Sequence, residues 1–114
     1  TVAEAITTGN PMGGPEIIAK AKEYNWLAED AAEEEILTSQ RKLGQAGYFV
    51  EPASTTTLTA VKKLRQKGKI GEDKKVLLML TGAGLKDFEV FQEHQFDTSE
   101  SDIENIRTDL ESIL

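Results

Sequence analysis

Apolar side chains recur at intervals of three and four residues in four stretches of the chain, which is the pattern of a helix with one buried face. The expected helices cover residues 15–24, 30–47, 54–68 and 101–113. Pro15 suits the first position of a helix, where its missing N–H costs nothing. Gly47 and Gly68 are placed to end the second and third helices in a left-handed conformation.

Polar residues mark the expected starts of the other helices. Asp30 with Glu33 three residues later resembles a capping box, and Ser101 with Glu104 repeats that pattern before the last helix. Ser54 is the expected N-cap of the third helix, because its hydroxyl can accept from an unpaired N–H of the first turn. The last helix carries one apolar face, which we expect to bury against the domain or against a second copy of the chain. That face consists of Ile103, Ile106, Leu110 and Ile113.

Three shorter apolar runs indicate strands: Trp26–Ala28, Tyr48–Val50 and Val76–Leu80. The third run is continuous, as in a parallel strand that is covered on both faces. Strands and helices therefore alternate along the chain. This order predicts an α/β fold, with a three-layer, parallel-strand βαβαβ core and an extra C-terminal amphipathic helix.

Acidic charge is concentrated at the end of the chain. Residues 1–86 carry 12 basic and 11 acidic side chains, whereas residues 87–114 carry 9 acidic side chains and only Arg107 as a base. Such a tail repels nucleic acid and anionic membranes, so neither is an expected partner. No apolar run approaches the roughly 20 residues of a membrane span. The absence of cysteine excludes disulfides and favours a cytoplasmic location.

Two segments lie where the carboxyl ends of parallel strands would meet, which is where open sheets bind ligands. These are Glu51–Ser54 after the second strand and Thr81–Gly84 after the third. Glycines there would let a ligand approach the backbone, and Thr81 supplies a hydroxyl. A purely steric need for a glycine-rich turn remains an equal interpretation of the same residues.

Other kinds of site are excluded by the sequence. A dinucleotide fingerprint would need a glycine at position 87, where Asp87 stands, and no phosphate-binding Gly-Lys-Ser/Thr motif occurs. His94 is the only histidine, so neither a histidine-rich metal site nor a catalytic triad is expected, and we place it on the surface. Lys86 is expected to pair with Asp87 or to be solvated.

Four blocks of sequence, in order, resemble threonine synthases. Thr1–Pro11 resembles the pattern T-[VI]-A-x-A-I-x-x-G-N-P of that family, and Glu34–Leu37 with Gln40 resembles its EEIL…Q helix. Gly47–Ser54 is similar to G-x-F-V-E-P-A-S, and Leu80–Asp87 matches L-T-G-x-G-L-K-D. The blocks span residues 1–87, which the resemblance implies are the C-terminal part of the large domain of a fold type II pyridoxal-phosphate enzyme. Residues 88–114 are then an acidic extension.

The resemblance implies a cofactor site made of Thr81, Gly82, Gly84, Gly9 and Asn10. Thr81 matches the family position whose hydroxyl bonds the pyridine nitrogen of pyridoxal 5'-phosphate. The two later glycines match a loop that passes close to the cofactor ring. Gly9 and Asn10 match a loop that lines the cofactor side of the cleft. No catalytic residue and no metal ligand is assigned within this chain.

Threonine synthases convert O-phospho-L-homoserine and water to L-threonine and phosphate. Their Schiff-base lysine and phosphate-binding loop lie N-terminal to the matching part, so we expect this chain to be inactive alone and its partner to be the remaining N-terminal part of the enzyme. Thr7 and Thr8 depart from the large apolar or basic residues usual in the family. Cysteate synthase, a threonine dehydratase-like enzyme and a non-catalytic binding module remain alternatives, as does a homodimer.

Overall fold

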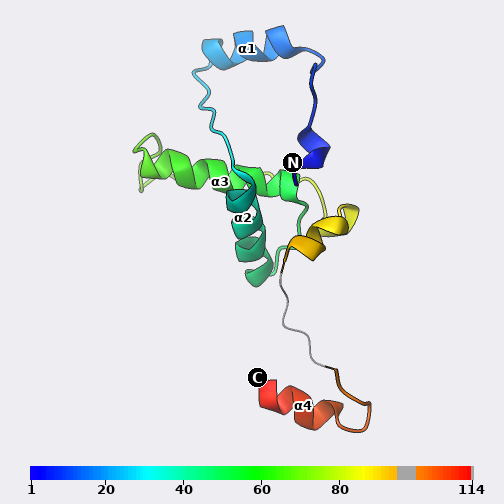
Figure 1. The fold of residues 1–114 in the computed structure, drawn as a ribbon. Helices are drawn as coiled ribbons and strands as arrows, with labels where there is room; N and C mark the ends of the chain where they lie inside the picture. Colours follow the sequence, from blue (N-terminus) through cyan, green and yellow to red (C-terminus); the bar gives the residue numbers. More distant parts are fainter. Residues whose placement is uncertain (95–99, 114) are drawn as a thin grey trace.

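The computed structural model describes residues 1–94 and 100–113, and its elements are helical. Four α-helices and three 3₁₀ helices occur in the described ranges (Figure 1). They are η1 (Glu4–Ile6), α1 (Gly14–Glu23), α2 (Glu33–Gln45), α3 (Pro52–Gln66), η2 (Gly84–Lys86), η3 (Glu89–Glu93) and α4 (Ile106–Ile113). None of the helices in these ranges is long and apolar enough to cross a membrane.

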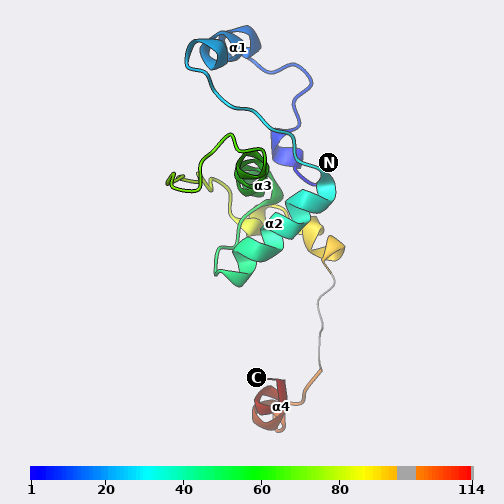
Figure 2. The same ribbon diagram turned by 90° about the vertical axis from the view of Figure 1, so that its left-hand side faces the viewer.

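Helices α2 and α3 pack against each other at the centre of the molecule (Figure 2). Ile36 of α2 is 2% exposed and anchors a small apolar core. Much of the remaining interface is polar, since the hydroxyls of Ser39 and Thr59 lie 2.8 Å apart and are buried. The buried Thr55 hydroxyl donates to the Pro52 carbonyl at 2.7 Å within α3. Hydrogen bonds therefore satisfy the polar groups that this interface removes from water.

The first residues of the chain are fixed to the beginning of α2. Ala3 is buried against Ile36 and Ala53, and the Val2 backbone N–H donates to Glu33 Oε2 at 2.7 Å. Hydrogen bonds from Thr1 and Val2 lower the pKa of Glu33, because they stabilise the ionised carboxylate. These contacts hold η1 beside α3.

Ion pairs fix the segment before α2 to the far half of α3. Lys63 Nζ lies 2.8 Å from Asp30 Oδ1 and 3.2 Å from Glu35 Oε2. Lys67 Nζ lies 2.5 Å from Glu29 Oε2. Lys63 lowers the pKa of Asp30, chiefly through the hydrogen bond between their side chains. The residues that lead into α2 are therefore held by charges on α3.

The helix ends agree with the sequence prediction better than the helix starts. Gly47 and Gly68 have φ values of 85° and 65°, which confirms the left-handed conformation expected after α2 and α3. At the start of α2, the Ala32 N–H donates to Glu35 Oε2 at 2.9 Å. The carboxylate cap expected from Asp30 and Glu33 therefore forms two residues later.

The expected parallel βαβαβ core is not formed, since the described residues contain no β-strand. Their one sheet-like contact is an isolated antiparallel bridge between Val50 and Ala83. Residues 76–80 take no part in a ladder there, and the Leu77 side chain is 85% exposed. The Trp26–Ala28 run is also exposed. A strand needs hydrogen-bonding neighbours at its edges, and a strand that is apolar on both faces also needs covering layers. The described part of the chain supplies neither.

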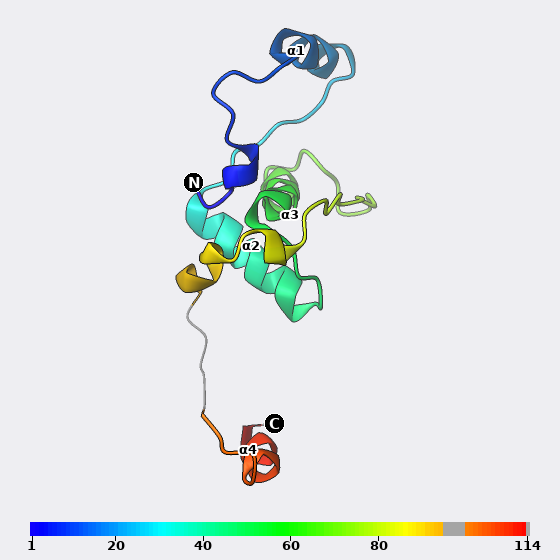
Figure 3. The same cartoon turned by 90° about the vertical axis from the view of Figure 1, so that its right-hand side faces the viewer.

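The molecule is extended for its size. Its radius of gyration is 18.5 Å, whereas a compact domain of this length has a radius of about 13 Å. Its accessible surface is 9356 Å², against about 6,200 Å² for a compact monomer of this mass. Helix α1 stands apart from α2 and α3 in all views (Figures 1 to 3), and its Ile17 and Ile18 are exposed. Much apolar surface is therefore open to a neighbour.

Helix α4 is shorter and more exposed than expected. It begins at Ile106 rather than near residue 101, and the Ser101 hydroxyl donates to Asp109 Oδ2 at 2.6 Å. Ile103 is 88% exposed, and Ile106 and Leu110 are also exposed. The expected burial of this face against the domain is therefore wrong for these three residues, and its burial against a second copy of the chain stays a prediction. The side chain of Ile113 lies outside the described residues.

Candidate functional site

The two segments that the sequence marks as strand ends meet in the structure. Val50 and Ala83 form the antiparallel bridge, with one backbone hydrogen bond on each side of it. The Glu51 N–H donates to the Gly82 carbonyl at 3.1 Å, and the Gly84 N–H donates to the Phe49 carbonyl at 3.1 Å. This pairing sets the position of the loop Thr81–Gly84 against the beginning of α3.

Ser54 holds the same loop with its side chain. Its hydroxyl oxygen accepts a 2.9 Å hydrogen bond from the Gly82 N–H and lies 3.5 Å from Thr81 Oγ1. The expectation that Ser54 caps the third helix is wrong, because α3 begins at Pro52 and Glu51 is its N-cap residue. Proline at the first position brings no N–H that needs a partner, so the Ser54 hydroxyl can serve the loop. The Thr81 side chain is exposed beside it.

Two neighbouring side chains explain the glycines of the loop. A Cβ atom at residue 82 would overlap the Glu51 carboxylate, and one at residue 84 would lie 2.8 Å from Cζ of Phe49. Gly82 and Gly84 are themselves buried. Close packing between the two segments therefore requires both glycines. Their contact with a cofactor stays a prediction.

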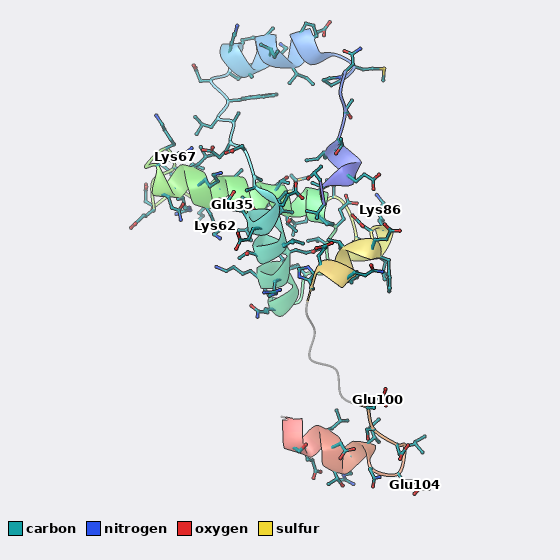
Figure 4. All side chains as sticks on the ribbon, in the orientation of Figure 1. Glu35, Lys62, Lys67, Lys86, Glu100 and Glu104 are labelled. Carbon is teal, nitrogen blue, oxygen red and sulfur yellow. The ribbon has the colours of Figure 1, made fainter. Side chains whose placement is uncertain are left out.

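Glu51 is a mostly buried carboxylate at this site, with a side chain 10% exposed. Lys86 Nζ lies 3.9 Å from Glu51 Oε2, while the rest of the Lys86 side chain is open to solvent (Figure 4). Lys86 thus pairs with Glu51 rather than with Asp87. A hollow of about 430 Å³ lies beside this pair. Its lining residues are Glu4, Ala5, Glu51, Ala53, Lys86, Asp87, Phe88 and Glu89.

The other two predicted cofactor residues lie elsewhere. Gly9 and Asn10 are exposed in the segment that joins η1 to α1. That segment leads away from α2, α3 and the loop Thr81–Gly84 (Figure 1). The structure therefore brings Thr81, Gly82 and Gly84 together with Ser54 and Glu51, and it does not bring Gly9 and Asn10 to them.

His94 is buried, so the prediction that it lies on the surface is wrong. It is 7% exposed, and its Nε2 lies 2.7 Å from Oε1 of Gln40 in α2. Burial lowers the pKa of His94, the charge of Arg41 lowers it further, and Glu93 opposes both effects. The apolar residues Val90 and Phe91 just before His94 were the sequence signal for a docked segment.

The described residues contain no group of three or more histidine, aspartate or glutamate side chains arranged to hold a metal ion. The chemistry of the loop comes instead from an exposed hydroxyl, a buried carboxylate and closely packed backbone. Together these can hold and orient a small organic group through hydrogen bonds.

Comparison with known sequences identifies the class of protein. A profile of the family described as "Pyridoxal-phosphate dependent enzyme" matches residues 1–82. The chain therefore belongs to the pyridoxal-phosphate-dependent enzymes, and this match supports the general fold type II architecture. The cofactor of the family is pyridoxal phosphate. The exposed Thr81 hydroxyl can donate or accept a hydrogen bond, so it is chemically able to contact a polar atom of such a cofactor.

Within the family, the chain is similar to threonine synthases. It is 39% identical to that of Methanocaldococcus jannaschii over 88 residues, which cover 76% of this chain and 22% of the relative. It is 40% identical to that of Methanosarcina acetivorans over 88 residues, which again cover 76% of this chain and 22% of the relative. It is 33% identical to the threonine synthase of Bacillus sp. strain ULM1 over 114 residues, which cover 99% of this chain and 31% of the relative. The chain thus spans between a fifth and a third of these relatives.

The acidic extension also has a counterpart. The family profile ends at residue 82, and the four matching blocks of sequence end at Asp87. The Bacillus threonine synthase nevertheless aligns with nearly the whole chain. Residues after the loop are therefore part of the similarity to that enzyme.

Proposed function

We propose that this chain is the C-terminal part of a threonine synthase, which converts O-phospho-L-homoserine and water to L-threonine and phosphate. The observation that carries the proposal is the loop Thr81–Gly84, held by the Val50–Ala83 bridge and by the Ser54 hydroxyl with the Thr81 side chain exposed. The similarity to threonine synthases over 88 residues supports this substrate class.

In this proposal, Thr81 binds the pyridine nitrogen of pyridoxal phosphate. The cofactor, when bound, supplies an electron sink for the amino-acid substrate. A neutral hydroxyl does not hold the ring nitrogen protonated, as a carboxylate would, so Thr81 moderates the sink. Ser54 positions Thr81 by fixing the next backbone N–H, at Gly82. Gly82 and Gly84 keep the loop close to Glu51 and Phe49.

The remaining parts of the site belong, in this proposal, to the N-terminal part of the enzyme. The chain has an exposed apolar segment at Val76–Leu80 that is suited to a central parallel strand. We propose that this segment pairs with strands of the N-terminal part to complete the large domain. The chain alone is then expected to be inactive, because the family's Schiff-base lysine and phosphate-binding loop lie in that part.

Replacing Thr81 by valine in the cofactor-containing enzyme tests the assignment. Thr81→Val keeps the shape of the side chain and removes its hydrogen bond. We expect the cofactor to remain bound with a shifted absorbance, and turnover to fall about tenfold or more, equivalent to about 1.4 kcal/mol of barrier. Spectra and single-turnover rates measure both effects.

Thr38→Val, an exposed change on α2, is the matched control and should alter neither quantity. If Thr81 only stabilises the turn, Thr81→Val would lower stability and leave turnover per folded molecule unchanged. Unaltered turnover and an unaltered cofactor spectrum would therefore refute the assignment.

A further inference from the structure

The segment after η2 reaches back to the bridge through a buried hydrogen-bonded relay. His94 Nε2 lies 2.7 Å from Gln40 Oε1, and Gln40 Nε2 donates a 2.9 Å hydrogen bond to the Val50 carbonyl. Gln40, Val50 and His94 are all buried. Val50 is the residue that bridges to Ala83, so the relay ends at the base of the loop Thr81–Gly84.

The chemistry of the relay fixes the direction of each hydrogen bond. A carbonyl oxygen can only accept, so the amide nitrogen of Gln40 must face Val50 and its oxygen must face His94. The Gln40 oxygen also only accepts, which requires a hydrogen on Nε2 of His94. The relay therefore selects one ring tautomer. Among the described residues, Arg41 of α2 and Glu93 of η3 are charged groups that act on the ring.

An aromatic contact joins the same two segments. The rings of Phe91 and Phe49 stack with centroids 5.1 Å apart, and the Phe88 ring meets Phe91 edge-on at 5.4 Å. Phe49 in turn lies directly against Gly84. In Figure 3 the chain through η2 and η3 runs past α2. Two independent contacts thus connect residues 88–94 to the bridge.

We propose that residues 88–94 hold the loop Thr81–Gly84 in its functional position, with His94 and Phe91 as positioning residues. His94 acts through Gln40 on the Val50 carbonyl, and Phe91 acts through Phe49 on Gly84. The benefit to a cofactor rests on the function proposed above for Thr81. The mechanical connection rests on the contacts alone.

Amide hydrogen exchange, followed by NMR in the 114-residue chain, measures the connection directly. The reporters are the N–H groups of Glu51 and Gly84, which flank the bridge. His94→Leu removes the donor to Gln40 and is expected to speed exchange at both reporters about tenfold or more. The N–H groups of Ile36 and Lys67, whose hydrogen bonds lie in α2 and at the end of α3, should keep their rates.

Two further variants separate positioning from general stability. His94→Gln can still donate to Gln40 and should restore much of the protection, which a loss of bulk alone would not explain. Gln92→Leu makes a similar apolar change at an exposed position in the same segment and should alter no reporter. If His94→Leu speeds exchange at all four N–H groups, Phe91→Leu decides the question. Faster exchange at the bridge alone supports the proposal, and unchanged exchange there overturns it.

Unprotected Glu51 and Gly84 amides in the unaltered chain would also overturn the connection, without bearing on the Thr81→Val test. In the cofactor-containing enzyme, His94→Leu is expected to shift the cofactor absorbance, whereas Gln92→Leu leaves it unchanged. Faster exchange at the bridge without a spectral shift would show that residues 88–94 hold the bridge but do not position the cofactor site.

Discussion

Two regions of the molecule differ in how composition relates to burial. The interface between α2 and α3 is polar yet buried, whereas the segment Val76–Leu80 is apolar yet largely exposed. The interface buries hydroxyl side chains such as Ser39 and Thr59 almost completely. The segment is a continuous apolar run, yet Leu77 and Met79 are largely exposed. Burial here follows the availability of a packing partner rather than side-chain hydrophobicity. The polar interface is complete within the chain, whereas Leu77 and Met79 are left uncovered by the described residues.

The largest expected effect comes from truncating a buried apolar side chain, compared with truncating an exposed one. Ile36→Ala removes the side chain at the centre of the core and should lower the free energy of unfolding by about 3 kcal/mol. Leu77→Ala removes the same number of carbon atoms from an exposed position. It should change the free energy of unfolding by less than about 0.5 kcal/mol. Urea unfolding followed by circular dichroism measures both. Equal losses would mean that residues 76–80 are buried in solution.

A double-mutant cycle measures the strength of the buried hydrogen bond between α2 and α3. Ser39→Ala and Thr59→Val each remove one hydroxyl of the buried pair, and their coupling should be about 1 kcal/mol. Thr59→Val should cost more than Ser39→Ala, because the Thr59 hydroxyl also lies 3.3 Å from the Glu35 carbonyl. Thr38→Val, on the exposed side of α2, gives the background value. Additive single effects would contradict the hydrogen bond.

The smallest expected effect concerns pH and the buried His94. Burial lowers its pKa from the ordinary value of 6.5, so the unfolded chain binds this proton more readily than the folded chain. The contribution of neutral His94 to the free energy of unfolding is therefore fully present above pH 6.5. It decreases as the pH falls below 6.5 and stops changing once His94 is also protonated in the folded chain. His94→Gln should make the midpoint of urea unfolding less dependent on pH between about pH 7 and pH 5. The same pH dependence in both proteins would show that His94 is not responsible.

Carboxylates produce a separate loss of stability at lower pH. The pKa values of Asp30, Glu33 and Glu35 are lowered by hydrogen bonds to their ionised forms. Their contributions are present above the ordinary values of 3.8 and 4.5 and disappear as the pH falls through the lowered ones. The histidine and carboxylate effects therefore occupy different pH windows.

Local signals predicted the helices, and long-range contacts explain the errors. The spacing of apolar residues located α1, α2 and α3, and glycines at positions 47 and 68 fixed where two of them end. The strands failed because a strand depends on neighbours that can be far away in sequence. A helix, in contrast, makes its own backbone hydrogen bonds.

The site shows the same division between local and distant information. The loop Thr81–Gly84 and the segment Glu51–Ser54 were recognised from their own residues, and the structure brings them together. The Ser54 hydroxyl bonds Gly82, which lies 28 positions away in the sequence. The local capping pattern instead predicted that this hydroxyl caps the third helix. His94 was misplaced for a similar reason, since its partner Gln40 is 54 positions away.

The open backbone of Val76–Leu80 has a consequence for how the chain behaves at high concentration. An exposed apolar strand with unpaired N–H and C=O groups is a template for pairing with an identical strand from another molecule. Lys74 and Lys75 lie directly before this segment, and Gly82 follows one residue after it. In-register stacking would bring like charges from each molecule together, which opposes growth of an aggregate. The two lysines are thus placed where gatekeeper charges flank a segment whose composition otherwise favours self-association.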